Sequence, residues 1–232
     1  MDPNIHRFTD MQSLTDELAG VIIRQLEKPH FKGRPASLVV PGGSTPVPLF
    51  QKLSHQALDW KRVFITLSDE RWVRVRDASS NERLLREHLL RNAAAAAHYV
   101  GLKSFTSDVD AGARKAWQRI EVVPRPFDIV VLGMGEDGHF ASLFAGDPAA
   151  ARGLDPAQPP GCVAVRAPAQ PSQRVSLNLS ALLHAHKVVL LATGDTKWKL
   201  IQQERVRDTS KNLPVRQLMM QQRVPVEIYW AP

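Results

Sequence analysis

A histidine and an aspartate, two residues apart in a glycine-rich loop, are the side chains of this chain best suited to moving protons. They are His139 and Asp137, in residues 133–139 (Gly-Met-Gly-Glu-Asp-Gly-His). Imidazole exchanges a proton near neutral pH, and a nearby carboxylate can assist it. Glycines let the backbone turn sharply and let a ligand approach closely. The pair therefore predicts an enzyme active site rather than a binding surface alone.

Two other interpretations of this loop compete. Its glycine spacing matches the dinucleotide-binding fingerprint. However, Glu136 and Asp137 at the open positions would repel a pyrophosphate. A helix after the loop would be short, because residues 146–148 (Gly-Asp-Pro) would end it, and no acidic ribose-binding residue follows at the expected distance. The remaining alternative is a tight turn in which the histidine is structural.

A second loop, residues 41–46 (Pro-Gly-Gly-Ser-Thr-Pro), has the composition of a phosphate cradle. We expect Ser44 or Thr45 to cap a helix whose first turn contains Pro46. Free backbone N–H groups and two hydroxyls at such a terminus favour an anion. No Gly-Lys-Ser/Thr follows, so the loop is not of the Walker type. The alternative is an ordinary turn between a strand and a helix.

Two further loops carry charged groups. Residues 68–72 (Ser-Asp-Glu-Arg-Trp) place Asp69 and Arg71 where they could orient a polar ligand, although a solvated charged turn would have the same composition. In residues 193–197, Lys197 opens a predicted helix and could reach an anion as a point charge.

Apolar segments alternate with segments of helical spacing. Strands are predicted at Ala36–Val40, Val63–Leu67, Phe127–Leu132, Cys162–Val165, Val188–Ala192 and Val226–Trp230, and helices at Met11–Leu26, Asn81–Leu90 and Ala111–Ile120. This alternation predicts an α/β fold, Rossmann-like, with a mostly parallel sheet and helices on both faces. We expect residues 1–232 to form one domain, with 146–171 as a surface excursion. Ligands of such sheets bind at the carboxyl ends of the strands, where these loops lie.

Composition narrows the class of partner. The formal net charge of +7 favours anionic ligands, but the basic residues form no tail and alternate with apolar ones, which argues against nucleic acid. The single cysteine, Cys162, excludes an internal disulfide and is expected to be a small buried residue on a strand. Neither a secretory signal nor an apolar run of membrane-spanning length is visible, so we expect a cytoplasmic protein without membrane contact.

Taken together and in order, these motifs resemble the 6-phosphogluconolactonase family. The matching residues are 41–46, 68–73, 79–81 (Ser-Ser-Asn), 133–139, 141–144 (Ala-Ser-Leu-Phe) and 193–197. The resemblance covers most of the chain. It implies hydrolysis of 6-phospho-D-glucono-1,5-lactone to 6-phosphogluconate without a metal or cofactor. It also implies the fold shared with glucosamine-6-phosphate deaminase, and we expect a monomer or a weak homodimer.

The resemblance also implies roles for individual residues. His139 corresponds to the general base and Asp137 to the acid beside it. The phosphate-binding set comprises Gly43, Ser44, Thr45, Arg71, Arg174 and Lys197, and Asp69 is expected to contact the substrate. The family often has threonine after the catalytic histidine, where this chain has Phe140, which is expected to change the pocket wall.

Two alternatives within the fold remain. A sugar-phosphate isomerase or deaminase could use Asp69 to abstract a proton. The deaminase, however, has a glutamate five residues after its histidine, and Phe144 at that position removes a proton-transfer partner. A non-catalytic sugar-phosphate sensor would usually carry a DNA-binding module, and the first 30 residues are too short for one.

Overall fold

A parallel sheet of seven strands forms the centre of the molecule. The computed structural model describes residues 3–206 and 213–232. The strand order is β1-β10-β9-β6-β2-β3-β5, and every pairing is parallel. The strands are β1 (Asn4–Arg7), β2 (Ala36–Val40), β3 (Val63–Leu67), β5 (His98–Val100), β6 (Ile129–Gly133), β9 (Val188–Thr193) and β10 (Val226–Ala231).

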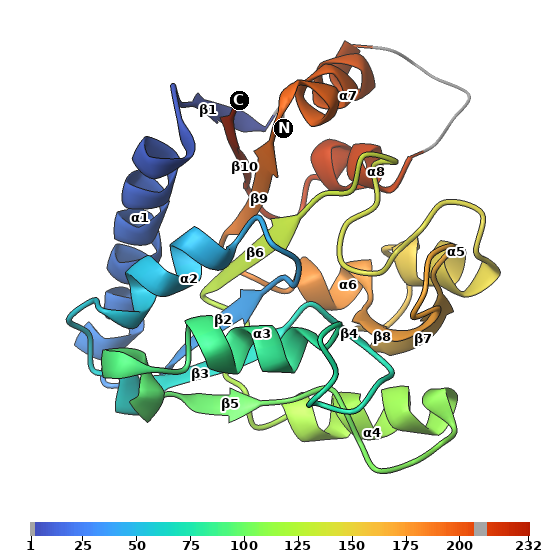
Figure 1. The fold of residues 1–232 in the computed structure, drawn as a ribbon, viewed down its shortest axis with the longest axis horizontal. Helices are drawn as coiled ribbons and strands as arrows, with labels where there is room; N and C mark the ends of the chain where they lie inside the picture. The colour runs from blue at the N-terminus through green and yellow to red at the C-terminus, as the bar shows by residue number, and fades with distance from the viewer. Residues whose placement is uncertain (1–2, 207–212) are drawn as a thin grey trace.

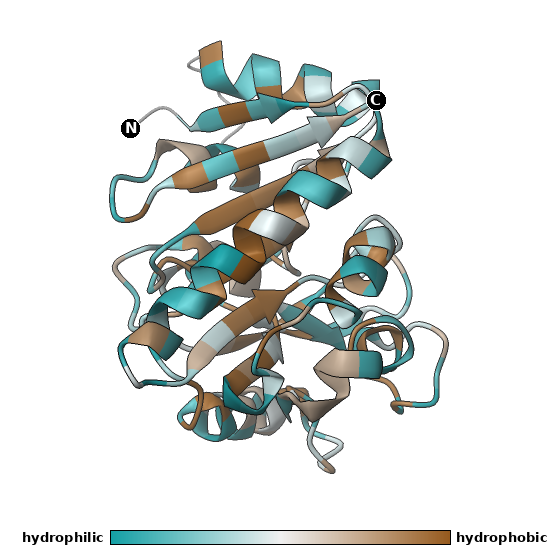
Figure 2. Ribbon diagram, turned by 90° about the vertical axis from the view of Figure 1, so that its left-hand side faces the viewer, coloured by the Kyte–Doolittle hydropathy of each residue, from teal (hydrophilic) through white to brown (hydrophobic). Residues whose placement is uncertain are grey.

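The central strands are continuous apolar runs because both faces of the sheet are covered. All five residues of β2 are buried, and in β6 and β9 only the last residue is not. Helix α1 crosses one face, while α6 and α8 lie on the other (Figure 1). In Figure 2 the inner strands are largely brown, with more of the teal residues on the surrounding helices and loops. The expected mostly parallel α/β architecture is confirmed.

Local capping explains where several helices begin. Asp10 precedes α1 and accepts a hydrogen bond from the Ser13 backbone N–H at 2.7 Å. Ser80 does the same for α3, and Asp147 for α5. The helices are α1 (Met11–Phe31), α2 (Val47–Ser54), α3 (Asn81–His88), α4 (Val109–Ile120), α5 (Pro148–Leu154), α6 (Leu179–Leu182), α7 (Asp195–Val206) and α8 (Pro214–Met220), with 3₁₀ turns at Trp60–Arg62 and Asn92–Ala96.

A second, antiparallel sheet of three strands joins the carboxyl edge of the first. It contains β4 (Asp69–Arg71), β8 (Gln173–Leu177) and β7 (Cys162–Arg166) in that order. Ser68, fully buried, links the two sheets, because its N–H donates to Val40 and its carbonyl accepts from Leu177, each at 2.8 Å. The residue after β3 is thus fixed to β2 on one side and to β8 on the other.

The six predicted strands and three predicted helices are present, with ends shifted by a few residues. The strands at Asn4–Arg7, Asp69–Arg71, His98–Val100 and Gln173–Leu177 were not predicted, since each is short or polar. Residues 146–171, predicted as a surface excursion, contain α5 and β7, and the latter includes Cys162.

Two predictions about helix ends were wrong. Neither Ser44 nor Thr45 caps α2, which starts after Pro46 without any side-chain cap. The Ser44 carbonyl instead accepts from Val47 in a turn, at 3.1 Å. Residues 146–148 do not end a helix either; they begin one, because Asp147 caps α5 through the Ala150 N–H at 3.0 Å. No helix in residues 3–206 or 213–232 is long and apolar enough to cross a membrane.

Candidate active site

The four loops singled out in the sequence meet around one cavity. They follow β9, β6, β2 and β3, which are neighbours in the sheet, so their carboxyl ends lie along one edge. The chain order reverses between β6 and β2, which is where ligands of such sheets bind. The cavity has a volume of about 230 Å³. It is lined by Pro41, Gly42, Gly43, Ser44, Thr45, Pro46, Asp69, Arg71, Asn81, Gly133, Met134, Gly135, His139, Ala141, Arg174 and Lys197.

His139 and Asp137 are in direct contact. The Nδ1 atom of His139 lies 2.5 Å from Oδ1 of Asp137, and the same oxygen accepts from the His139 backbone N–H at 3.2 Å. The hydrogen bond from the imidazole lowers the pKa of the Asp137 carboxyl. An ionised carboxylate at Nδ1 favours the tautomer with a proton on Nδ1, which leaves Nε2 able to accept one. The pair can therefore act as an oriented base.

Gly135 has to be glycine for this pair to form. A Cβ atom there would lie 2.2 Å from Cε1 of His139 and 2.6 Å from Oδ1 of Asp137. The Gly135 N–H donates to the His139 carbonyl at 2.9 Å, and the Gly138 N–H donates to the Gly135 carbonyl at 3.1 Å. Both N–H groups are engaged within the loop and do not face an oxyanion as free donors.

Replacing Gly135 by alanine should lower kcat about tenfold or more, because the ring and the carboxylate must both move away from the new methyl group. Gly133→Ala is the matched control, since its nearest neighbour would be the Cβ of Pro41 at an ordinary 3.8 Å. The comparison needs kcat and the melting temperature of both variants. Equal loss of kcat in the two would contradict this steric explanation.

The wall beside the imidazole is aromatic. The rings of His139 and Phe144 lie 4.3 Å apart, centroid to centroid, and the guanidinium carbon of Arg174 lies 5.4 Å from the Phe144 ring. Phe144 therefore contacts both the proposed base and one of the cations. Phe140, expected at the pocket wall, is instead fully buried in the hydrophobic core. The expected effect of Phe140 on the cavity is thus wrong, and the aromatic neighbour of the base is Phe144.

Two arginines face each other across the small sheet. Arg71 on β4 is paired directly with Arg174 on β8, which is only 8% exposed. Burial and the charge of Arg71 lower the pKa of the Arg174 guanidinium. Like charges directly opposite in an antiparallel pair are destabilising. In the described chain neither arginine has a carboxylate at ion-pair distance, and the buried Nε of Arg71 has no hydrogen-bond partner. The arrangement favours a bound anion.

The glycine-rich loop and α7 complete this cationic side. Gly43 has φ of +86°, a left-handed conformation that glycine adopts without strain. Within residues 3–206 and 213–232, no group accepts a hydrogen bond from the backbone N–H of Gly43, Ser44 or Thr45. Lys197 lies in the first turn of α7, as predicted, and lines the same cavity. These residues offer a lysine and several N–H and hydroxyl donors to one ligand.

Asn81 was not among the predicted site residues. Its side-chain amide donates to the Asp69 carbonyl at 2.8 Å, and it lies so close to Gly42 that a Cβ there would meet it at 1.9 Å. Asn81 is the first residue of α3, and the sequence offers no local sign of its approach to Gly42. The Ser-Ser-Asn segment at 79–81 was noticed only through the family resemblance.

The two adjacent carboxylates of the second loop have different surroundings. Both oxygens of Asp69 accept hydroxyl hydrogen bonds, from Ser68 at 3.0 Å and from Ser142 at 2.6 Å, and the residue lines the cavity. Glu70 instead points to the start of α3. It accepts from the backbone N–H groups of Arg71, Asn81 and Glu82, each at 2.7 Å, and from the Ser80 hydroxyl at 3.1 Å.

Burial raises the pKa of the Glu70 carboxyl, and the three backbone donors oppose that shift. Glu70→Gln should reduce the free energy of unfolding by about 1 to 3 kcal/mol, since an amide NH₂ would face at least one backbone N–H. Urea denaturation measures this loss. The exposed Glu121 at the end of α4 gives the control, Glu121→Gln, which should change stability by less than about 0.5 kcal/mol. A smaller loss for Glu70→Gln than for the control would contradict the capping role.

Comparison with known proteins agrees with this geometry. The family model described as glucosamine-6-phosphate isomerases/6-phosphogluconolactonase matches residues 9–230. The 6-phosphogluconolactonase of Pseudomonas putida is 38% identical over 98% of this chain and 93% of its own length. That of Rhizobium meliloti is 36% identical over the full length of both.

Solved structures give the same result. A 6-phosphogluconolactonase from Shewanella baltica superposes with a TM-score of 0.93 at 40% identity, covering 100% of this chain and 98% of the other. A monomeric glucosamine-6-phosphate deaminase shares the fold, with a TM-score of 0.77 at 16% identity over 97% of this chain and 96% of its own.

Proposed function

The chain belongs to the family of glucosamine-6-phosphate isomerases and 6-phosphogluconolactonases, and from this premise we propose that it hydrolyses 6-phospho-D-glucono-1,5-lactone to 6-phosphogluconate. One observation carries the proposal: an oriented histidine base and three cationic side chains line the same small cavity. A lactone with a phosphate at its far end needs both, one for the ester and the other for the phosphate.

The phosphate binds on the cationic side of the cavity. Arg71 and Arg174 lie opposite each other on β4 and β8, and Lys197 approaches from α7. The backbone N–H groups of Gly43, Ser44 and Thr45, with the two hydroxyls, bind the remaining phosphate oxygens. Charge-assisted hydrogen bonds of this kind contribute about 1.5 to 3 kcal/mol each. Asp69 accepts a hydrogen bond from a sugar hydroxyl.

His139 activates the water. Its Nε2 takes a proton as the water oxygen attacks the lactone carbonyl carbon, and a tetrahedral intermediate forms. The bond from that carbon to the ring oxygen then breaks, and the imidazolium returns the proton to the departing oxygen. Asp137 keeps the ring in the productive tautomer and stabilises the imidazolium, as a carboxylate does in a hydrolytic triad.

Phe144 favours hydrolysis over deamination. A deaminase must open a sugar ring and move protons between oxygen and carbon, which needs further proton-transfer groups near the histidine. The residue against His139 is a phenyl ring, which cannot transfer a proton.

The test is hydrolysis of freshly generated 6-phosphogluconolactone, corrected for its spontaneous opening. We expect acceleration in proportion to enzyme concentration and no ammonia release from glucosamine 6-phosphate. Folded protein that does not accelerate the opening would refute lactone hydrolysis. Ammonia release at a comparable rate would assign the deaminase reaction instead.

A further inference from the structure

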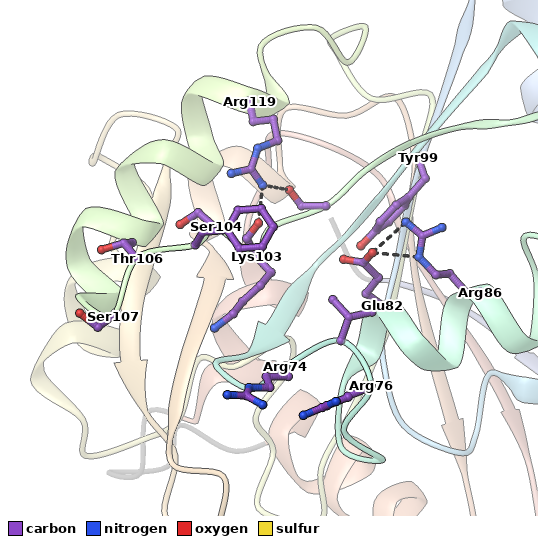
Figure 3. A pocket seen from close by; sticks show the side chains of 13 residues that line it. Arg74, Arg76, Glu82, Arg86, Tyr99, Lys103, Ser104, Thr106, Ser107 and Arg119 are labelled. Atoms are coloured by element: carbon purple, nitrogen blue, oxygen red, sulfur yellow. Dashed lines mark hydrogen bonds and ion pairs between the residues drawn. The ribbon is translucent and has the colours of Figure 1, made fainter.

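A second, larger cavity lies outside the candidate active site. Its volume is about 910 Å³, within the range of small-molecule sites. It lies between residues 74–76, helix α3 and residues 101–107, which precede α4 (Figure 3). It shares none of its lining residues with the cavity that contains His139. The proposed lactone chemistry therefore leaves this cavity unexplained.

Three cationic side chains lie on one side of this cavity. They are Arg74, Arg76 and Lys103, and Figure 3 shows them ending near one another. Across the described parts of the chain, none of the three forms an ion pair or donates a side-chain hydrogen bond. Lys103 has only the Trp72 ring, 3.7 Å from its Nζ, and burial lowers the pKa of its ammonium group.

The other cations of the cavity are already engaged, which sets these three apart. Arg86 forms an ion pair with Glu82 at 2.8 Å. Arg119 donates to the carbonyls of Gly101 and Lys103, both at 2.7 Å. The Arg74 and Arg76 side chains are exposed, so their guanidinium groups are free to bind an anion beside Lys103. A ligand with more than one negative charge fits this arrangement.

A buried hydroxyl gives independent support. Ser104 lines the cavity and is only 8% exposed, and its Oγ has no hydrogen-bond partner among the described residues. An unpaired buried hydroxyl is destabilising, so such groups in folded proteins are usually hydrogen-bonded. A polar group of a bound ligand would satisfy it.

The remaining walls include two aromatic residues. Tyr99 lines the side opposite the three cations (Figure 3), and Phe105, fully exposed, also lines the cavity. Aromatic side chains stack on planar rings, and the volume is far greater than a single phosphate group needs. The cavity therefore combines charged groups with aromatic side chains that can hold a ring.

We propose that this second cavity binds a nucleoside diphosphate. The two phosphate groups bind Arg74, Arg76 and Lys103, a polar atom of the ligand pairs with Ser104, and the base lies against the aromatic residues. The proposal is independent of the lactonase assignment, because the two cavities have no residue in common.

Isothermal titration of the full-length protein with ADP tests this proposal. We expect saturable binding that is unchanged in His139→Asn and unaffected by excess 6-phosphogluconate. The double variant Arg74→Ala/Arg76→Ala should bind ADP at least about tenfold more weakly, and Ser104→Ala several-fold more weakly. Arg24→Ala, which removes the same charge from an exposed position on α1, should bind as the wild type does. Pyrophosphate and adenosine should each bind more weakly than ADP.

Several results would overturn the proposal. They are no heat of binding with millimolar ADP, equal affinity in the double variant, and displacement of ADP by 6-phosphogluconate. Pyrophosphate binding as tight as that of ADP would remove the role assigned to the aromatic wall. Lactone hydrolysis measured on the same samples separates failure of this proposal from failure of the proposed activity.

Discussion

His139→Asn should lower kcat for lactone hydrolysis at least about a hundredfold while leaving the fold intact. Asparagine can still donate to Asp137 from about the position of Nδ1, but it has no atom that can take the proton accepted by Nε2. Asparagine is smaller than histidine and keeps the contact with Asp137, so the fold should remain intact although the contact with the Phe144 ring is lost. The measurement is kcat beside a thermal unfolding curve and the affinity for 6-phosphogluconate, both of which should stay close to wild type.

A double variant makes this prediction sharper. Asp137 is proposed to act only through the imidazole. Asp137→Asn alone should therefore lower kcat about tenfold or more, whereas the same change should lower kcat almost no further in the His139→Asn variant. If the fold-losses of kcat in the two single variants multiply in the double variant, Asp137 has an independent role. A kcat within about threefold of wild type in His139→Asn would show that another group activates the water.

Arg71→Ala should reduce kcat/KM about ten- to a hundredfold, since it removes a charge-assisted contact to the phosphate. It removes the repulsion of Arg174 but also the hydrogen bond from Arg71 to the Ser79 carbonyl, so the free energy of unfolding should change little. Lys197→Ala should give a loss of similar size. Arg166→Ala is the matched control, because Arg166 is an exposed arginine on β7 of the same small sheet and does not line the cavity.

The unphosphorylated substrate distinguishes phosphate binding from general damage. With D-glucono-1,5-lactone the wild type should be much slower, and Arg71→Ala should cost little further activity. An equal loss of kcat/KM on both lactones would show that Arg71 maintains the structure of the site and does not bind the phosphate. Near-wild-type kcat/KM of Arg71→Ala and Lys197→Ala on the phosphorylated lactone would refute their assignment.

The central sheet could be predicted from the sequence because the composition of each inner strand indicates a buried strand. Runs such as Val63–Leu67 and Val188–Thr193 are apolar throughout, and a parallel sheet covered on both faces requires this. The small sheet could not be predicted in that way. Asp69–Arg71 consists of three charged residues, which is typical of a loop, and it becomes a strand only through pairing with β8.

The candidate site divides in the same way. The contact between His139 and Asp137 is local, because only Gly138 separates them along the chain, and the sequence alone predicted it. The opposition of Arg71 and Arg174 depends on the register of two distant segments, so the sequence pointed to Arg71 by itself, and only the family resemblance added Arg174. Asn81 was missed because its approach to Gly42 depends on how α3 packs against the first loop.

The junction at Ser68 has a consequence for which lactones the protein should accept. The proposed base is carried by the parallel sheet and the paired arginines by the antiparallel one, so the separation of these groups is set by how the two sheets are joined. Ser68 holds that joint by backbone hydrogen bonds to both sides and has no exposed surface. The joined sheets thus fix the distance between the proposed base and the paired arginines, and with it the distance between ester and phosphate in a lactone that can bind. A lactone phosphate shorter by one carbon would have its carbonyl drawn away from His139, and misplacement by about 1 Å can cost about a hundredfold in rate.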